Sequence, residues 1–347
     1  MTSVAGPGED GDRRNVSDAT GVLVLGACAA WSLITAGVRD GRPEGVLLAV
    51  LAVAAGYATG RICGALLPVA APCAGALAGA GLTVAVPRLT PGPQIAVPLG
   101  HAGATAALLV LSTGAACCAA WAAAPGRRPA LGALAAGITV TAAVLGSVTG
   151  FVACAAVLLC SLAAGRVHRR GPGIAGLALS AGLITAGTWA VAGDALPGGL
   201  ARFLEGPLTP HRIGLWRDAL GLARRDAALG VGPGRFGDLS PTTLRTLLPD
   251  GRPHSAPLQQ AAEQGVVGVL LLAAAFCWVL YALWRSARPT PVALSAAAAL
   301  TAVAGIASVG NALSFTAVSA GAGVLAGLAT ARPLTDDAPG SAGRARA

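Results

Sequence analysis

The residues best suited to chemistry are the arginines and a histidine in the one long hydrophilic segment of the chain, residues 194–257. An arginine guanidinium binds phosphate oxygens in a bidentate manner and stays charged when partly desolvated. A neutral histidine is the usual general base near neutral pH. The acidic residues of the segment are scattered and form no metal-binding motif, so no metal is predicted. The segment therefore suits a reaction in which a lipid-linked diphosphate leaves and a hydroxyl attacks.

Two other patterns are assigned no chemistry. Gly232, Gly234 and Gly237 have the GxGxxG spacing of a dinucleotide site, but no strand precedes them, and a tight turn is the better interpretation. The eight cysteines all lie within apolar runs, where cysteine acts as a small hydrophobic residue, and none shows a CxxC spacing.

The composition indicates what kind of structure must position these residues. Of 347 residues, 54% are hydrophobic and 11% are charged, and the mean hydropathy is +0.69. A soluble domain carries roughly 25% charged residues, so this chain cannot cover a water-soluble particle. The net charge of +9 comes from arginines spaced singly or in pairs, with no basic stripe for nucleic acid. We predict an all-α, polytopic integral membrane protein whose partner is the lipid bilayer and not nucleic acid.

Apolar runs free of Asp, Glu and Arg recur along the chain, and a membrane-spanning helix needs about 20 such residues. Pro68 and Pro72 interrupt the third run, and residues 146–150 mark a turn between the fifth and the sixth. About ten transmembrane helices are therefore expected, at residues 21–38, 45–60, 62–87, 101–124, 130–149, 150–165, 173–193, 258–284, 290–308 and 311–331.

These runs divide the chain into five regions. Residues 1–20 are predicted to be a disordered cytoplasmic tail, 21–193 to hold about seven transmembrane helices, 194–257 to form a large external loop, 258–331 to hold about three more helices, and 332–347 to be a second cytoplasmic tail. The orientation follows from the positive-inside rule. With both termini in the cytoplasm, the short external loops hold only Arg39, Arg42 and Arg88.

The loop itself is predicted to be folded around an amphipathic helix. Thr209-Pro210 is a helix start, and Gly230 is a plausible end. Between them one apolar face forms, and we expect it to lie on the outer membrane surface; it consists of Ile213, Trp216, Leu220, Ala223 and Ala227. Ser240-Pro241 opens a second, shorter helix by the same reasoning.

Three motifs in this loop resemble the O-antigen ligase and polymerase (Wzy-type) superfamily. They are Arg212-x-x-x-Trp216-Arg217, the Gly-Val-Gly-Pro-Gly-Arg-Phe turn at 230–236, and His254 followed by Leu258 and Glu263-x-Gly265-x-x-Gly268. Their order, their spacing, their position on a large external loop and the helices that follow agree with that family. Specific matching covers about residues 202–268.

The resemblance implies a metal-independent, inverting glycosyltransferase with a GT-C-like fold and no cofactor. Such enzymes transfer a glycan from undecaprenyl diphosphate to an acceptor hydroxyl, on a glycan or glycolipid, at the outer face of the bacterial cytoplasmic membrane. Ligation and polymerisation use the same chemistry and are not distinguished. By this resemblance His254 is the general base, Arg212 the leading diphosphate ligand, Arg217 a weaker one, and Trp216, Gly232 and Glu263 support the site.

Two departures keep other functions open. The family usually has asparagine where this chain has Ser255, and many members have a Ser-Arg-Gly element whose arginine faces the diphosphate, whereas residues 147–150 hold none. A non-catalytic relative that binds lipid-linked glycan is one alternative. A transporter or flippase is another, although it would place ionisable residues inside the spans, and few are found there.

Each candidate also has a simpler interpretation. Arg212 and Arg217 could anchor the amphipathic helix to lipid headgroups, and His254 could be a solvated loop residue. Glu263, near the start of a span, lies at the interface or pairs with a loop arginine. His211 is a second choice for the base, and Asn311 is expected to be a turn residue.

Overall fold

The structure is a computed structural model that describes residues 7–89, 98–167, 169–195, 210–245, 251–332 and 334. This part of the chain forms helices and no strand. Its ten main helices are α1 (Pro7–Arg39), α2 (Glu44–Leu66), α3 (Ala70–Leu89), α4 (Pro98–Ala122), α5 (Arg128–Val144), α6 (Val148–Ala164), α7 (Arg170–Ala192), α12 (Ala256–Arg285), α13 (Thr290–Val309) and α14 (Thr316–Thr330). The smaller elements are α9 (Pro210–Arg225), α10 (Phe236–Leu239), α11 (Pro241–Leu244) and two 3-10 turns, Pro125–Arg127 and Ala312–Ser314.

Each apolar run predicted as a span forms one of the ten main helices, so the all-helical prediction is confirmed for the described residues. Six of these helices are long and apolar enough to cross a membrane, and they lie in α1, α2, α4, α7, α12 and α13. Shorter apolar helices occur in α3, α6 and α14. The predicted total of about ten spans stays a prediction.

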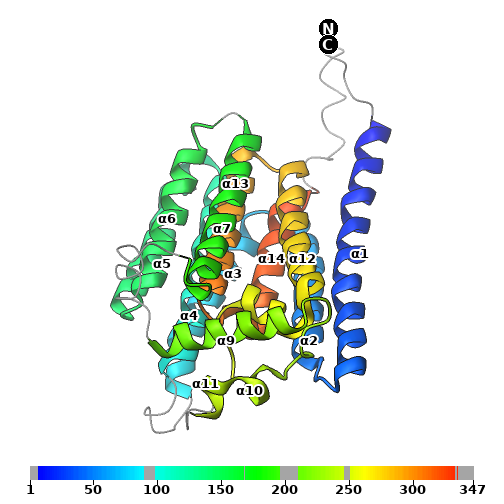
Figure 1. The fold of residues 1–347 in the computed structure, drawn as a ribbon. Coiled ribbons are helices and arrows are strands. Elements are labelled where there is room, and N and C mark those ends of the chain that lie inside the picture. Colours follow the sequence, from blue (N-terminus) through cyan, green and yellow to red (C-terminus); the bar gives the residue numbers. More distant parts are fainter. Residues whose placement is uncertain are drawn as a thin grey trace, which may run out of the picture.

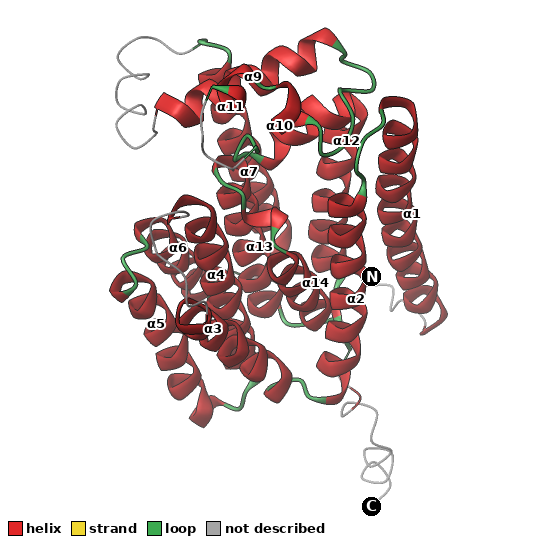
Figure 2. Ribbon diagram, turned by 90° about the horizontal axis from the view of Figure 1, so that it is seen from below, coloured by secondary structure: helices red, strands yellow, loops and turns green. Residues whose placement is uncertain are grey.

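The main helices run up and down as a bundle, with α9, α10 and α11 gathered at one end and the start of α1 and the end of α14 at the other (Figure 1). We call these the α9 end and the terminal end. Asn311 lies at the α13–α14 connection, in the turn predicted for it. Seen from the α9 end, the three short helices lie over the part of the bundle that contains α7 and α12 (Figure 2).

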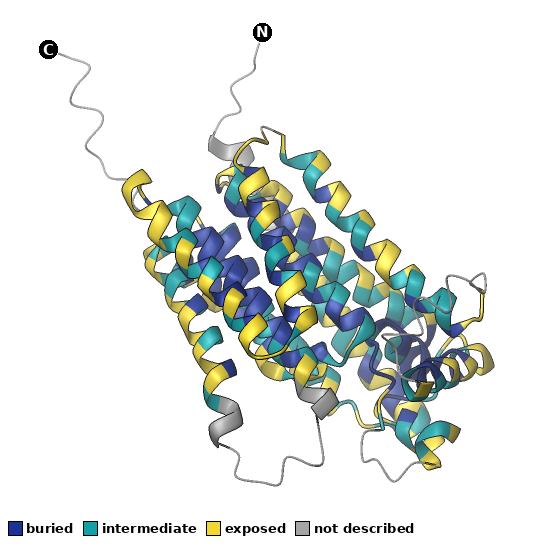
Figure 3. Cartoon of the chain, turned by 90° about the vertical axis from the view of Figure 1, so that its left-hand side faces the viewer, coloured by how far each residue is buried: buried dark blue, intermediate teal, exposed yellow. Residues whose placement is uncertain are grey.

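Burial separates inner from outer helices. α4 and α13 are buried over most of their length, whereas few residues of α1, α2 and α7 are buried (Figure 3). The exposed surfaces of the outer helices carry large apolar side chains, among them Leu23 on α1, Leu51 on α2 and Leu183 on α7. Exposed apolar surface on this scale is what a bundle surrounded by lipid requires.

Helices α2 and α14 approach each other so closely that glycine is required at their contact. A Cβ atom on Gly56 or Gly60 would lie 2.3 Å from a carbonyl oxygen of α14, that of Ala320 or Val324. A Cβ on Gly327 would lie 2.3 Å from Tyr57 O on α2. Small residues four apart allow membrane helices to pack backbone against backbone.

Helix α12 is broken at Gly265, which has φ 68° and ψ −163°. The break leaves two backbone groups, Gln264 O and Val266 N, without partners in the helix, and α1 and the segment after α9 supply hydrogen-bond partners for them. Trp31 Nε1 on α1 donates to Gln264 O at 3.0 Å, and Val266 N donates to Ala227 O, just beyond α9, at 2.8 Å. The break therefore joins α12 to both α1 and the α9 segment.

Replacing Gly265 with alanine should destabilise the protein by about 2 kcal/mol or more, because non-glycine residues are strained in this backbone region. A Cβ atom there would also lie 2.4 Å from Ala228 O. The matched control is Gly182→Ala on α7, where a Cβ atom would meet open space. Thermal unfolding in detergent should show a lower midpoint for Gly265→Ala alone; equal midpoints for the two variants would contradict the argument.

Two boundaries differ from the sequence predictions. Helix α1 begins at Pro7, within the predicted disordered tail, and its contacts with other helices include two at Ser17 and Asp18. Trp278 Nε1 on α12 donates to Ser17 O at 2.9 Å, and Arg61 on α2 pairs with Asp18 at 3.0 Å. Arg61 was expected in a connection, but α2 continues through it to Leu66, since Pro68 and not the charge sets the boundary.

Candidate active site

The amphipathic helix α9 packs on protein and not along a lipid surface. It begins at Pro210, as predicted. The buried face of α9 contacts the end of α7 and the first turns of α12 and forms a second apolar core, which contains Leu215, Trp216, Ala219, Leu220, Leu222, Leu258 and Ala262. The expectation that this face lies on the membrane is therefore corrected: the apolar stripe is real, but α7 and α12 cover it.

The far end of α9 also differs in detail. The helix ends at Arg225, one turn before Gly230, and Asp226 Oδ1 then accepts a hydrogen bond from Leu229 N at 3.2 Å. Ala223 is half-buried and Ala227 exposed, so the buried face stops short of the predicted one. The chain is thereby free to turn toward α12 at Gly230.

Arg212 lies one helical turn before Trp216 and therefore on the same side of α9. Its side chain is half-buried, and no hydrogen bond or ion pair reaches it from the described residues. Desolvation by burial lowers the pKa of this guanidinium, as expected for a cation that lacks a counter-charge. Such a group is suited to bind an anion, because a bound anion would relieve the desolvation.

Arg217, the weaker candidate ligand, is placed differently. Its exposed guanidinium forms an ion pair with Asp194, which follows α7. Exposed pairs of this kind contribute at most about 1 kcal/mol and are screened by salt. The structure therefore separates the two arginines that the motif groups together: Arg212 lies toward the buried face, and Arg217 lies on the outer one.

Trp216 is almost completely buried, and the described residues offer no acceptor to its indole N–H. It packs with Leu258, in the first turn of α12. Through this contact the side of α9 that carries Arg212 is joined to the beginning of α12, where His254 and Ser255 precede the helix.

His254 is buried, with 8% exposure, and has a positive φ of 51°. This backbone region is uncommon for residues other than glycine, and outliers of this kind concentrate at functional sites. Ser255 occupies the N-cap position of α12, but its buried hydroxyl neither caps the helix nor finds another partner within the described residues. The histidine is thus held at a helix N-terminus and is not a solvated loop residue.

The glycine-rich turn at 230–236 is fixed against α12 by its backbone. Val231 N donates to Ala262 O at 2.8 Å and Gly232 N donates to Glu263 O at 2.9 Å. A Cβ atom on Gly230, which has φ +66°, would lie 2.5 Å from the Glu263 carbonyl carbon. The turn is therefore a structural connection, as predicted, and Gly232 is part of it.

Glu263 secures the same turn with its side chain. It is 4% exposed, and its carboxylate accepts hydrogen bonds from the backbone N–H groups of Gly234 and Phe236, with Gln259 Nε2 at 3.4 Å. Arg252 contributes a favourable charge interaction. The pairing with a loop arginine is thus a minor part of a role that consists mainly of binding backbone amides.

Two further residues, one at the end of α1 and one in the α1–α2 connection, contact the glycine-rich turn and its flanking residues and do not belong to the motifs. Arg39 forms an ion pair with Asp226, and its carbonyl accepts a hydrogen bond from Arg235 Nη1 at 2.6 Å. Arg42 donates its backbone N–H to Pro233 O at 2.7 Å and pairs with Asp238 at 3.3 Å. The sequence held a signal for them, because Arg39 and Arg42 lie where the sequence predicts a short external loop, and arginine is uncommon in such loops.

The acidic residues of the segment have structural partners. Asp218 on α9 accepts hydrogen bonds from Ser240 Oγ at 2.6 Å and Thr242 N at 2.9 Å, and so fixes the start of α11, which begins at Pro241 as predicted. Across the described ranges no group of three metal-binding side chains occurs. Glu205 and Asp250 lie outside the described residues.

Residues 147–150, which correspond to the Ser-Arg-Gly element of many family members but hold no arginine, form the start of a helix. Ser147 Oγ accepts a hydrogen bond from Gly150 N at 3.1 Å and caps α6. This cap lies at the α9 end, because α5 ends and α6 begins there (Figure 1). The serine of the family element thus has a capping role, with no cation beside it in the sequence.

Apolar spans, a bundle with an exposed apolar surface and a polar segment folded over one end define a multi-pass helical membrane protein. A family model described as O-antigen ligase matches residues 99–273, half of the chain and well beyond the motifs. The chain belongs to the O-antigen ligase family, and its function is of the ligase or polymerase type in bacterial polysaccharide biosynthesis. Neither a curated protein nor a solved structure matches it.

Proposed function

We propose that the protein transfers a glycan from undecaprenyl diphosphate to an acceptor hydroxyl, with inversion and at the external face of the cytoplasmic membrane. The observation that carries the proposal is Arg212, a half-buried cation without a counter-charge among the described residues, on the side of α9 joined to the start of α12. The family match supports glycosyl transfer in general. The scarcity of arginine in short loops at the α9 end supports placing that end outside.

The proposed step uses two residues. His254 accepts the proton of the acceptor hydroxyl as its oxygen attacks the anomeric carbon of the donor. The bond from that carbon to the diphosphate oxygen breaks, and its electron pair leaves with undecaprenyl diphosphate. Arg212 binds the diphosphate and stabilises the charge that develops on it, which allows the leaving group to depart without a metal ion. Glu263 and Gly232 hold the turn beside the site, and Trp216 holds α9.

The test uses the purified full-length protein in detergent with lipid-linked glycan extracted from its own host. Release of undecaprenyl diphosphate is followed with and without a chelator, for the parent and for His254→Ala and Arg212→Ala. Release by the parent that survives chelation and requires both residues is the expected result. Donor binding without any release, with binding dependent on Arg212, would replace the transferase by a non-catalytic glycan-binding relative, which Ser255 and the missing second arginine favour.

A further inference from the structure

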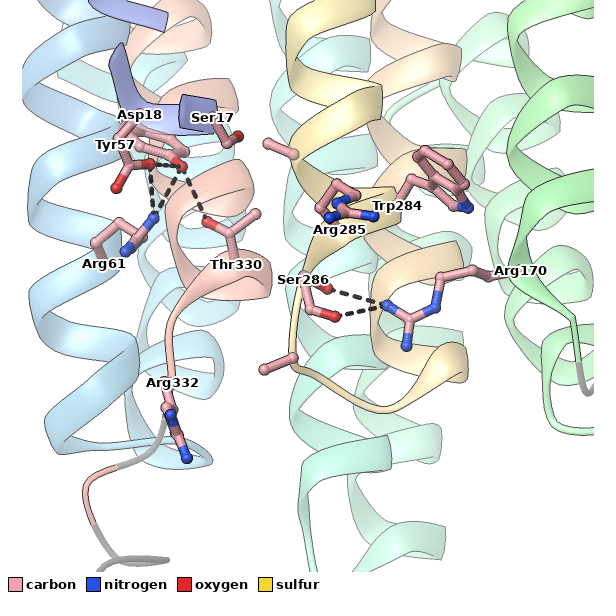
Figure 4. A pocket seen from close by; sticks show the side chains of 12 residues that line it. Ser17, Asp18, Tyr57, Arg61, Arg170, Trp284, Arg285, Ser286, Thr330 and Arg332 are labelled. Atoms are coloured by element: carbon pink, nitrogen blue, oxygen red, sulfur yellow. Dashed lines mark hydrogen bonds and ion pairs between the residues drawn. The ribbon is translucent and has the colours of Figure 1, made fainter. Parts of the chain in front are cut away.

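A cavity of about 470 Å³, seen from close by in Figure 4, opens at the terminal end of the bundle, opposite the α9 end. Five helices contribute to its lining: α1, α2, α7, α12 and α14. Among the lining residues that the structure describes, four are arginines, namely Arg61, Arg170, Arg285 and Arg332, and one is acidic, Asp18. The cavity therefore has a strong positive excess.

Within the described chain, Asp18 forms an ion pair with one of these arginines, Arg61. Arg61 Nη1 donates to Asp18 Oδ1 at 3.0 Å and to the Tyr57 hydroxyl at 3.1 Å, on one side of the cavity (Figure 4). On the other side, Arg170 donates to Ser286 O at 2.8 Å and to Arg288 O at 3.2 Å. These two acceptors are neutral, so the full charge of Arg170 is kept.

Arg285 and Arg332 are exposed, and within the described residues neither forms an ion pair. Arg285 lies over the ring of Trp284, 5.7 Å from its centroid. Trp284 and Tyr281 are themselves exposed on α12, with ring centroids 5.9 Å apart. Exposed Trp and Tyr rings near the end of an apolar helix are typical of the membrane–water interface, where lipid phosphates lie.

We propose that this cavity binds a phosphate group, either that of an anionic lipid headgroup or free phosphate. Arginines bind phosphate oxygens through charge-assisted hydrogen bonds, and the hydroxyl of Ser286, which accepts from Arg170 Nη1 at 3.4 Å, can add a further donor. Basic pockets between transmembrane helices are suited to anionic headgroups. Because the ligand would touch α2, α7, α12 and α14, it would hold together helices at the end of the bundle that lacks α9. The proposal does not depend on the transferase activity.

The test compares two double variants of the full-length protein in neutral detergent. Arg285→Gln/Arg332→Gln removes two cavity charges that stabilise no described ion pair. Arg127→Gln/Arg166→Gln is the matched control, since both residues are exposed in connections at the same end and outside the cavity. Thermal unfolding midpoints are measured at constant ionic strength with added phosphatidylglycerol, phosphatidylcholine or inorganic phosphate.

The parent and the control should show a saturable rise in midpoint with phosphatidylglycerol that exceeds the rise with phosphatidylcholine. The cavity variant should require at least about tenfold more lipid for the same rise. A response to phosphatidylglycerol alone identifies a headgroup, whereas an equal response to inorganic phosphate identifies free phosphate. The proposal fails if neither stabilises the parent, or if the cavity variant responds as fully as the control.

Discussion

Replacing His254 with asparagine should lower the single-turnover rate of glycan transfer by about 10²–10⁴-fold, the usual contribution of a positioned general base. Asparagine is the preferred substitute because it tolerates the positive φ of 51° at this position, so the backbone should be preserved while the imidazole is lost. Donor binding should remain within a few fold of the parent, because the diphosphate is assigned to Arg212.

The measurement is the release of undecaprenyl diphosphate from a saturating donor, with donor binding recorded separately on the same preparations. His211→Ala is the control, since His211 is a half-buried histidine next to Arg212 on α9 and the second choice for the base. It should retain most of the rate. If the loss follows His211 and spares His254, the base has been assigned to the wrong residue.

Arg212→Ala should weaken donor binding by about a hundredfold, whereas Arg217→Ala should change it by less than about threefold. Hydrogen bonds from a charged group to its ligand contribute about 1.5–3 kcal/mol, and each 1.4 kcal/mol is a factor of ten. The two arginines are matched in type and share one helix. They differ because Arg217 is exposed and already paired with Asp194, while Arg212 is half-buried without such a partner in the described chain.

Binding of lipid-linked glycan to each variant at several salt concentrations checks this difference. Arg212→Lys should recover only part of the affinity, because an ammonium cannot reproduce the bidentate contact of a guanidinium. Equal losses for Arg212→Ala and Arg217→Ala would show that both act only through their net charge, as anchors to lipid headgroups would.

The positions of the helices could be predicted because apolar runs and their breaks are local properties of the sequence. Pro68 follows the end of α2 at Leu66, and Gly146, which has φ +71°, lies in the turn between α5 and α6. The partner of an apolar face is not local. Periodicity identified the stripe on α9, but a stripe that faces lipid and one that faces α12 have the same spacing.

In the candidate site, too, the residue types could be read from the sequence, whereas their partners could not. Residue types indicated which side chains could bind phosphate or accept a proton, and the motif placed them on one segment. Which of the two arginines is paired within the described chain depends on Asp194, a residue distant in the sequence from both. The function of Glu263 likewise depends on the backbone amides of Gly234 and Phe236, which no side-chain pattern reveals.

The close contact between α2 and α14 affects the order in which the newly made protein chain can assemble. The glycines of α2 meet a helix that begins about 250 residues later at Thr316, so this contact forms only when the end of the chain has been made. Until α14 is made, the glycine face of α2 lacks its partner, and lipid tails or another helix must cover that face. The last helix is therefore a closing element, and a chain truncated before it would retain the motifs proposed for catalysis while lacking the contact between α2 and α14.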